Sequence, residues 1–245
     1  MSRQKWRETM ADTGQLRKTF GGVFDNRTIM TLSKLLQGGK LASLESVIKQ
    51  GKESLVLAGQ GEKAPVAIKV YAVEAANFRR MQPYLEGDPR FKGLRGDRAS
   101  TIKAWAMKEF KNLMRARDAG VNCPEPITVR DNVLILGFIG DYPLPAPRLT
   151  DSEISDPQGV YEQVVMAMRL LWNKAKIVHG DLSEYNILLW NDQTWLIDFS
   201  QSMVSEHPLA TELLERDARN IAKFFKKLGV DTDDEKVLSE VRKPF

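Results

Sequence analysis

Three side chains close together near the C-terminal end of the chain could support metal-dependent chemistry on a phosphate. Asp181 and Asn186 lie in the stretch HGDLSEYN, and Asp198 follows in IDFS. Carboxylate and amide oxygens suit Mg²⁺ or Mn²⁺, and Mg²⁺ usually takes only one or two protein carboxylates. A further carboxylate nearby could accept a proton from a hydroxyl group. These residue types predict Asn186 and Asp198 as metal ligands and Asp181 as a catalytic base.

The segment between Asn186 and Asp198 predicts how these two residues come together. Two apolar, β-prone runs flank the turn Asn191-Asp192-Gln193, which is typical of a β-hairpin. Asn186 and Asp198 each lie six residues from Asp192. Antiparallel pairing about that centre would place them opposite each other at the open end of the hairpin.

The spacing H-x-D-x-x-x-x-N, followed by an aspartate at a strand end, is that of the protein-kinase catalytic loop and its metal aspartate. Residues 179–186 and Asp198 have this spacing. We expect His179 to act as a scaffold that bonds backbone groups near Asp181. A capped loop beside a polar hairpin end would show the same spacing without catalysis.

The N-terminal half provides an independent indication. Lys69 lies in a Val-Ala-Ile-Lys strand, where kinases carry the lysine that pairs with phosphates. Glu109 lies on or beside the apolar face of a predicted helix and needs a cation to offset its desolvation. Lys69 could supply that charge, although a buried pair of this kind can also be purely structural.

The elements that must position these residues predict an α+β fold of two lobes with a cleft between them. We expect five strands and a helix, then a proline-rich linker at 140–147, then a helical half with one hairpin. The first half contains a helix at 28–37, strands at 44–48, 55–58, 66–71 and 133–138, and a helix from an N-cap at Ser100 to Ala119. Two further helices are predicted at 158–176 and about 209–228.

The expected boundaries are a tail at 1–22, an N-lobe at 23–140 with a basic flexible insert at about 79–100, and a C-lobe at 141–245. Between Arg79 and Lys103 we count seven basic and three acidic residues, an excess equal to the net charge of +4. Such a patch could attract nucleic acid or acidic surfaces. A solvated, mobile loop would have the same composition.

The overall composition is that of an ordinary globular protein. Cys123 is the single cysteine of the 245 residues, so no intramolecular disulfide can form. No apolar run approaches the length of about 20 residues that spans a membrane. The polar N-terminus also lacks the apolar core of a signal peptide. We therefore expect a cytoplasmic protein without membrane contacts.

At this point the chain resembles the RIO family of atypical serine/threonine protein kinases, and specifically its type-1 branch. The resemblance runs from about residue 23 to residue 230. It is carried by VFDNRT (23–28), GKES (51–54), VAIKVY (66–71), KEFKNL (108–113), GFIGDYPLPAP (137–147), HGDLSEYN (179–186), IDFSQS (197–202) and LLERDARNI (213–221). The resemblance implies a two-lobed protein-kinase-like fold with a small antiparallel N-lobe sheet and a reduced helical C-lobe.

The resemblance also implies the nucleotide contacts. Lys69 would hold the ATP phosphates and pair with Glu109. The loop with Lys52, Glu53 and Ser54 would cover the phosphates, and the backbone at Gly137 and Ile139 would meet adenine. The branch usually has Ser-Thr where this chain has Lys49-Gln50, and an acid where Gly137 stands. An adenine contact through backbone groups would survive the second change.

For the chemistry, the resemblance implies Asp181 as the catalytic aspartate and Asn186 and Asp198 as the ligands of Mg²⁺ or Mn²⁺. Some members are thought to act as ATPases in which the counterpart of Asp198 accepts phosphate. We therefore expect ATP-dependent phosphoryl transfer to serine or threonine, as autophosphorylation or ATPase activity. The family implies a link to small ribosomal subunit maturation, with pre-ribosomal RNA and proteins as partners of a monomer.

Two other functions remain open at this stage. The chain could be a ribosome assembly factor that uses nucleotide only as a conformational switch. It could also be a small-molecule kinase of the aminoglycoside or choline type, since these enzymes share the H-x-D-x-x-x-x-N loop.

Overall fold

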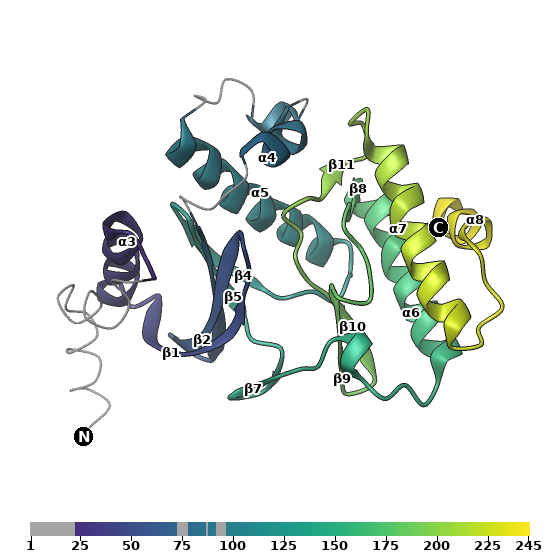
Figure 1. Cartoon of the computed structure of the whole chain (residues 1–245), viewed down its shortest axis with the longest axis horizontal. Coiled ribbons are helices and arrows are strands. Elements are labelled where there is room, and N and C mark those ends of the chain that lie inside the picture. The colour runs from purple at the N-terminus through teal and green to yellow at the C-terminus, as the bar shows by residue number, and fades with distance from the viewer. Residues whose placement is uncertain (1–22, 73–77, 87, 92–96) are drawn as a thin grey trace. The chain divides into compact units, whose positions relative to one another are not determined.

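The computed structural model describes residues 23–72, 78–86, 88–91 and 97–245, and these form two compact units (Figure 1). Of the described residues, the first unit contains 23–72, 78–81, 97–107 and 126–138, and the second contains the rest. The predicted tail at 1–22 lies outside the described residues. So do positions 87 and 92–96 of the basic insert, and the side chains of Arg79 and Arg80.

A five-stranded antiparallel sheet forms the centre of the first unit. Its strand order is β1-β2-β3-β5-β4. The strands are β1 (Leu41–Gln50), β2 (Ser54–Gly61), β3 (Pro65–Tyr71), β4 (Pro126–Arg130) and β5 (Val133–Gly137). The expectation of five strands is confirmed, although β4 was not located in advance. β3, which carries Lys69, is the central strand and pairs with β2 and β5.

Helix α3 (Asn26–Gln37) packs beside this sheet, as its periodicity predicts. The Asp25 side chain caps it by accepting a hydrogen bond from Thr28 N–H, and the chain leaves the helix at Gly38. Its apolar face joins the buried residues of β1, β2, β3 and β5 in one core, to which the helix contributes Ile29, Leu32, Leu35 and Leu36.

Helix α5 (Arg98–Asp118) begins two residues earlier than predicted. Asp97 caps it, because Ser100 N–H donates to Asp97 Oδ1 at 2.9 Å. The prediction of Ser100 as N-cap was therefore wrong, since an aspartate three residues earlier accepts that N–H. Gly120 follows the predicted helix end at Ala119 and has a φ of 89°, as is common after a helix C-terminus. Described parts of the basic insert are helical rather than looped, in α4 (Phe78–Leu85) and η1 (Pro89–Phe91).

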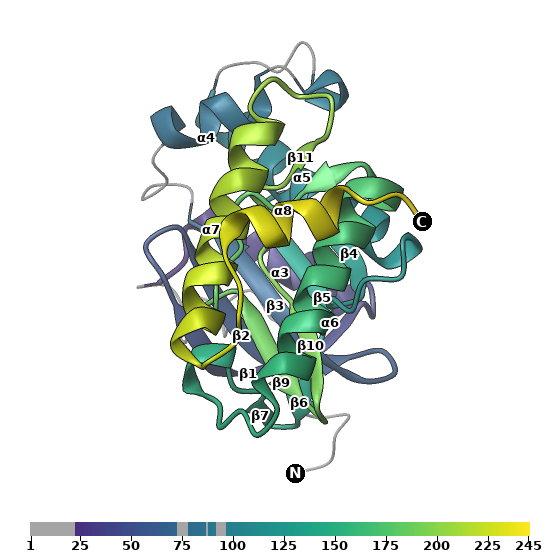
Figure 2. The ribbon, with the colours of Figure 1, turned by 90° about the vertical axis from the view of Figure 1, so that its right-hand side faces the viewer.

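Three helices group together in the second unit, where α8 (Asp234–Arg242) contacts both α6 (Pro157–Leu170) and α7 (Ala210–Lys227) (Figure 2). The predicted helix at 158–176 changes to a π-helical turn, η3 (Leu171–Ala175), before Lys176 adopts a left-handed conformation. α8 was not predicted. No helix of the described chain is long and apolar enough to cross a membrane.

The predicted hairpin forms from β9 (Ile187–Trp190) and β10 (Gln193–Leu196), but its register differs by one residue. Only Asn191 and Asp192 form the turn, with φ of 50° and 57°, as in a two-residue type I′ hairpin. Asn186 therefore faces Ile197, whose N–H donates to Asn186 O at 3.0 Å. The prediction that Asn186 lies directly opposite Asp198 is wrong.

Asp198 lies one position beyond this pairing, and its φ of 65° ends the extended strand. The alternation of side chains along β10 thus does not continue to Asp198. Two further short pairings follow in this unit: β8 (Ile177–Val178) with β11 (Met203–Val204), and β6 (Gly140–Asp141) with β7 (Leu144–Pro145). The β8–β11 pairing brings the chain after Asp198 back to the start of the loop that contains Asp181. The 3₁₀ turn η2 (Leu149–Asp151) precedes α6.

Candidate active site

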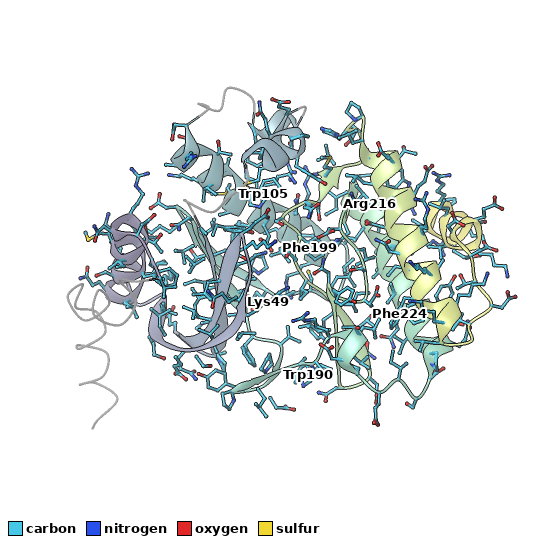
Figure 3. All side chains as sticks on the ribbon, viewed as in Figure 1. Lys49, Trp105, Trp190, Phe199, Arg216 and Phe224 are labelled. Carbon is cyan, nitrogen blue, oxygen red and sulfur yellow. The ribbon has the colours of Figure 1, made fainter. Side chains whose placement is uncertain are left out.

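The backbone on both sides of Asp181 is held by helix α7. Asp217 accepts hydrogen bonds from Gly180 N–H at 2.7 Å and from Leu182 N–H at 2.9 Å. Arg216 donates to Gly180 O, and Asn220 Nδ2 donates to Leu182 O at 3.1 Å. The position of Arg216 on α7 can be followed in Figure 3. These contacts fix the loop while leaving the Asp181 side chain to other partners.

Burial dominates the electrostatics of Asp217, which is 1% exposed. Burial raises the pKa of this carboxyl to about 7, and the two backbone N–H groups and Arg216 act in the opposite direction. Asp217 was not predicted as a site residue. It lies in the quoted motif LLERDARNI, but only the tertiary contact shows what it does.

His179 bonds backbone groups near Asp181, as its predicted scaffold role requires. Its Nδ1 accepts from Asp181 N–H at 3.4 Å, which leaves Nε2 to donate to Ile197 O at 3.0 Å. The ring packs 4.8 Å from that of Phe199, which is labelled in Figure 3. His179 thus joins the loop that precedes the hairpin to the strand end that follows it.

The structure brings Asp181 and Asn186 together. Asn186 Nδ2 donates to Asp181 O at 2.7 Å and lies 3.3 Å from Asp181 Oδ2. Asp181 Oδ2 also accepts from Gln201 Nε2 at 3.0 Å. Asp198 Oδ1 accepts from Ser200 Oγ at 2.8 Å. Each carboxylate is therefore oriented by one of two adjacent side chains, Ser200 and Gln201.

The donor set of Asn186 and Asp198 fits a hard divalent cation. A carbonyl oxygen, Asp181 O, accepts from Asn186 Nδ2, so the amide orientation is fixed and Oδ1 is the atom that could act as a ligand. One carboxylate and one amide oxygen match the small number of protein ligands that Mg²⁺ takes. The described residues contain no cluster of three or more His, Cys, Asp or Glu side chains placed for a metal ion.

In the first unit, Lys69 is 6% exposed on the central strand, where it pairs with Val56 and Leu134. Its Nζ lies 5.2 Å from the centre of the Tyr71 ring. Burial of an ammonium group is costly unless it serves a partner or a ligand. The predicted strand position of Lys69 is confirmed.

The predicted phosphate-covering loop is shorter than the sequence suggested. Residues 48–50 belong to β1, and the connection to β2 is a tight turn in which Gly51 N–H donates to Ser54 O at 2.9 Å. Lys52 is exposed at this turn, and Glu53 O accepts from Ala72 N–H at 2.9 Å. The turn therefore presents Lys52 to solvent while Ser54 already belongs to the strand.

The remaining predicted nucleotide contacts lie in different units. Glu109 is 1% exposed on α5 and belongs to the second unit, whereas Lys69 belongs to the first, so their pairing stays a prediction. Gly137 is the last residue of β5. Ile139 lies in the second unit, where its carbonyl oxygen accepts from Ala146 N–H at 2.9 Å, and its adenine contact stays a prediction.

Two buried polar residues of α5 were missed by the sequence analysis. Lys108 Nζ donates to Ser200 O at 2.9 Å and to Ser202 O. Asn112 Nδ2 donates to Phe199 O at 3.0 Å and to Ser202 O at 2.9 Å. Both side chains are fully buried, and burial lowers the pKa of Lys108 to about 7.

Comparisons with known proteins show the family of this chain. The RIO domain family matches residues 55–238. The RIO-type serine/threonine-protein kinase Rio1 of Haloferax volcanii is 42% identical over 230 residues, covering 94% of this chain and 79% of that protein. The Rio1 kinase of Methanocaldococcus jannaschii is 42% identical over 214 residues, covering 87% of this chain and 73% of that protein.

Solved structures show the same fold. The Rio2 kinase–ADP/Mg²⁺–phosphoaspartate complex from Chaetomium thermophilum matches with a TM-score of 0.66 at 21% identity. The match covers 91% of this chain and 68% of that one. The expected α+β, protein-kinase-like fold is thereby confirmed. From its matching domain and its relatives, the chain belongs to the RIO family of serine/threonine-protein kinases.

Proposed function

We propose that the chain is a type-1 RIO kinase that transfers the γ-phosphoryl group of ATP, with Mg²⁺ or Mn²⁺, to a serine or threonine or to water. The curated relatives are named Rio1, which supports the branch. The observation that carries the reaction is the pair of carboxylates, Asp181 and Asp198, oriented by Gln201 and Ser200. Relatives named as protein kinases favour this reading over a small-molecule kinase.

Asp181 acts as the catalytic aspartate, and Asn186 and Asp198 hold the metal ion. An ion held by these two residues would supply positive charge that offsets the negative charge of the phosphates. The Asp181 carboxylate orients the attacking hydroxyl and takes its proton. Gln201 and Asn186 each lie within hydrogen-bonding distance of Asp181 Oδ2, and these contacts restrict the carboxylate to one orientation.

Asp198 has a second proposed role as phosphate acceptor in ATP hydrolysis. The Rio2 structure described as a phosphoaspartate complex supports this chemistry. A carboxylate oxygen of Asp198 would attack the γ-phosphorus as the bond to ADP breaks. Water would then cleave the acyl phosphate and restore the carboxylate, with net hydrolysis of ATP to ADP and phosphate.

The nucleotide itself is held by groups from several elements. Lys69 binds the phosphates and takes Glu109 as its partner, and the turn at 52–54 lies over the phosphates through Lys52. Backbone groups of Gly137 and Ile139 contact adenine. Lys69 is buried on a central strand, which supports a fixed position for its ammonium group.

We further propose that the kinase works in maturation of the small ribosomal subunit, with precursor RNA and proteins as partners. The basic residues between positions 79 and 103 would contact RNA phosphates. Arg90 is less suited to this role, because it forms an ion pair with Asp88 at 2.6 Å and only 12% of its side chain is exposed. Lys103 fits better, since 63% of its side chain is exposed and its ion pair with Asp131, at 3.5 Å, is open to solvent.

Labelling with ATP that carries ³²P on the γ-phosphate tests the proposed reaction. The protein should acquire label with Mg²⁺, and the chemical stability of that label identifies the acceptor. A phosphoaspartate is cleaved by hydroxylamine, whereas phosphoserine and phosphothreonine resist it. Absence of both label and released phosphate from the folded protein would refute phosphoryl transfer and leave a nucleotide-switched assembly factor.

A further inference from the structure

The segment that follows Asp198 touches both proposed catalytic carboxylates. Ser200 Oγ donates to Asp198 Oδ1 at 2.8 Å, and Gln201 Nε2 donates to Asp181 Oδ2 at 3.0 Å. Hydrogen bonds to charged acceptors are stronger than those between neutral groups. Because the two donors are adjacent, one displacement of their backbone would shift both carboxylates at once.

The backbone of this segment is fastened to α5 by the two buried residues that the sequence analysis missed. Lys108 holds the carbonyl oxygens of Ser200 and Ser202, and Asn112 holds those of Phe199 and Ser202. Water does not compete for these bonds, since both side chains are 0% exposed. Loss of either donor would leave a buried carbonyl oxygen without that bond.

Two neighbouring contacts support this arrangement. One holds the segment at Ser202, and the other orients the amide of Asn112. Ser202 Oγ donates to His179 O at 2.8 Å, which ties the segment to the loop before Asp181. Arg90 Nη1 donates to Asn112 Oδ1 at 2.9 Å, while Asp88 pairs with the same guanidinium. The oxygen and the nitrogen of the buried Asn112 amide are therefore each committed to a hydrogen-bond partner.

We propose that Phe199–Ser202 is the positioning element for Asp198 and Asp181, and that Lys108 and Asn112 are the positioning residues that hold it. This inference rests on the proposed function and deepens it. None of the four segment residues needs to touch the nucleotide. Loss of the attachment to α5 leaves both carboxylates present but no longer aligned, and a misplacement of about 1 Å can cost a reaction about a hundredfold in rate.

Substitutions within the segment should separate the effect on Asp198, which is seen in the Mg²⁺ requirement, from the effect on Asp181, which is seen in kcat. Ser200→Ala removes the bond to Asp198, so the Mg²⁺ concentration for half-maximal turnover should rise about tenfold with little change in kcat. Gln201→Leu removes the bond to Asp181, so kcat should fall about tenfold at an unchanged Mg²⁺ requirement.

Substitution of Lys108, which attaches the segment to α5, should produce both effects in one variant. Lys108→Met should raise the Mg²⁺ requirement and lower kcat together, because Lys108 holds the backbone that carries both donors. Lys111→Met is the matched control on the same helix. Lys111 is partly exposed, and its Nζ lies 5.6 Å from the centre of the Phe91 ring, so neither quantity should change.

The experiment measures turnover against Mg²⁺ concentration and, separately, Mn²⁺ binding by electron paramagnetic resonance with a non-hydrolysable ATP analogue. Urea unfolding corrects each rate for the folded fraction. The expected result is weaker Mn²⁺ binding in Ser200→Ala and Lys108→Met, and binding like that of the unmodified protein in Gln201→Leu and Lys111→Met.

Unchanged Mn²⁺ binding in Ser200→Ala, or identical behaviour of the Lys108 and Lys111 variants, would overturn the positioning role. Should Lys108→Met fail to fold, the two segment variants decide, since they leave the contacts from α5 intact. If the proposed phosphoryl transfer itself is wrong, the result is different, because the unmodified protein would then lack Mg²⁺-dependent turnover. Mn²⁺ binding would still report on the contact between Ser200 and Asp198.

Discussion

A Cβ atom on Gly180 would lie 3.0 Å from the carbonyl oxygen of Gln201. The loop before Asp181 and the segment after Asp198 thus approach so closely that a Cβ would require a shift of a few tenths of an ångström, at a residue whose φ is 79°. Gly180→Ala should therefore cost about 1–3 kcal/mol of unfolding free energy. It should also lower kcat, because the clash displaces the residue that holds Asp181.

Gly229→Ala provides the matched control for this prediction. Gly229 has a φ of 89°, and among the described residues other than its chain neighbours no heavy atom lies within 4 Å of a Cβ built there. This variant should lose stability from backbone strain alone and keep the kcat of the folded protein. Urea unfolding and turnover at saturating ATP measure both quantities, and an equal kcat in the two variants would show that the close approach is not needed for catalysis.

Asp217 should make stability depend on pH. Its pKa is raised from 3.8 to about 7, so the folded protein binds this proton more tightly than the unfolded chain does. The resulting stabilisation is fully present below pH 4 and is lost as the pH rises through about 7. The loss amounts to at most about 4 kcal/mol.

Asp217→Asn removes this titration and serves as the reference. The difference in unfolding free energy between the unmodified protein and the variant should fall between pH 5 and pH 8, as measured by urea unfolding. A difference that stays constant over this range would mean that Asp217 does not titrate there.

Asp181→Asn should lower the rates of phosphate release and autophosphorylation by a hundredfold or more while sparing the fold. The amide keeps the shape of the side chain but is not a base. Asp192→Asn makes the same chemical change at an exposed position in the β9–β10 turn and should leave both rates unchanged. Retained activity in the Asp181 variant, measured beside this control, would refute the assignment of Asp181.

Lys69→Met should weaken ATP binding at least tenfold in a fluorescent-nucleotide titration, because methionine fills the space of the buried stem without its charge. Lys49→Met, on the exposed edge strand β1 of the same sheet, is the control and should bind normally (Figure 3). Equal affinities in the two variants would remove Lys69 from the nucleotide site.

Cys123 should not react with iodoacetamide in the folded protein at pH 8. The side chain is 0% exposed, and burial raises the pKa of the thiol to about 12, so almost no reactive thiolate is present. Mass spectrometry should show alkylation only after unfolding in urea. Rapid alkylation under native conditions would contradict this burial.

Features that depend on local sequence patterns could be predicted from the sequence. A short apolar run placed Lys69 on a strand, and helical periodicity placed Glu109 on a buried face. Loop spacing predicted the backbone contacts of His179. The prediction of the hairpin register was wrong because the turn contains two residues, Asn191 and Asp192, both with left-handed backbone. The predicted turn had contained three residues. That one-residue difference changes which residue faces Asn186.

Other features depend on partners distant in sequence. Lys108 and Asn112 resemble ordinary polar residues beside an apolar helix stripe until residues 199–202 are brought to them. Asp217 likewise acquires its role only when α7 lies beside the loop at Gly180 and Leu182. No spacing rule within one element could have indicated these contacts.

Asn186 and Asp198 are proposed to hold the metal ion that serves the transferred phosphoryl group, with Asp181 beside it. A crystal structure with Mg²⁺ and a non-hydrolysable ATP analogue tests this most directly. The account predicts Mg²⁺ at about 2.0–2.1 Å from oxygens of Asn186, Asp198 and the phosphates. A nucleotide-bound Mg²⁺ that contacts neither residue would contradict it.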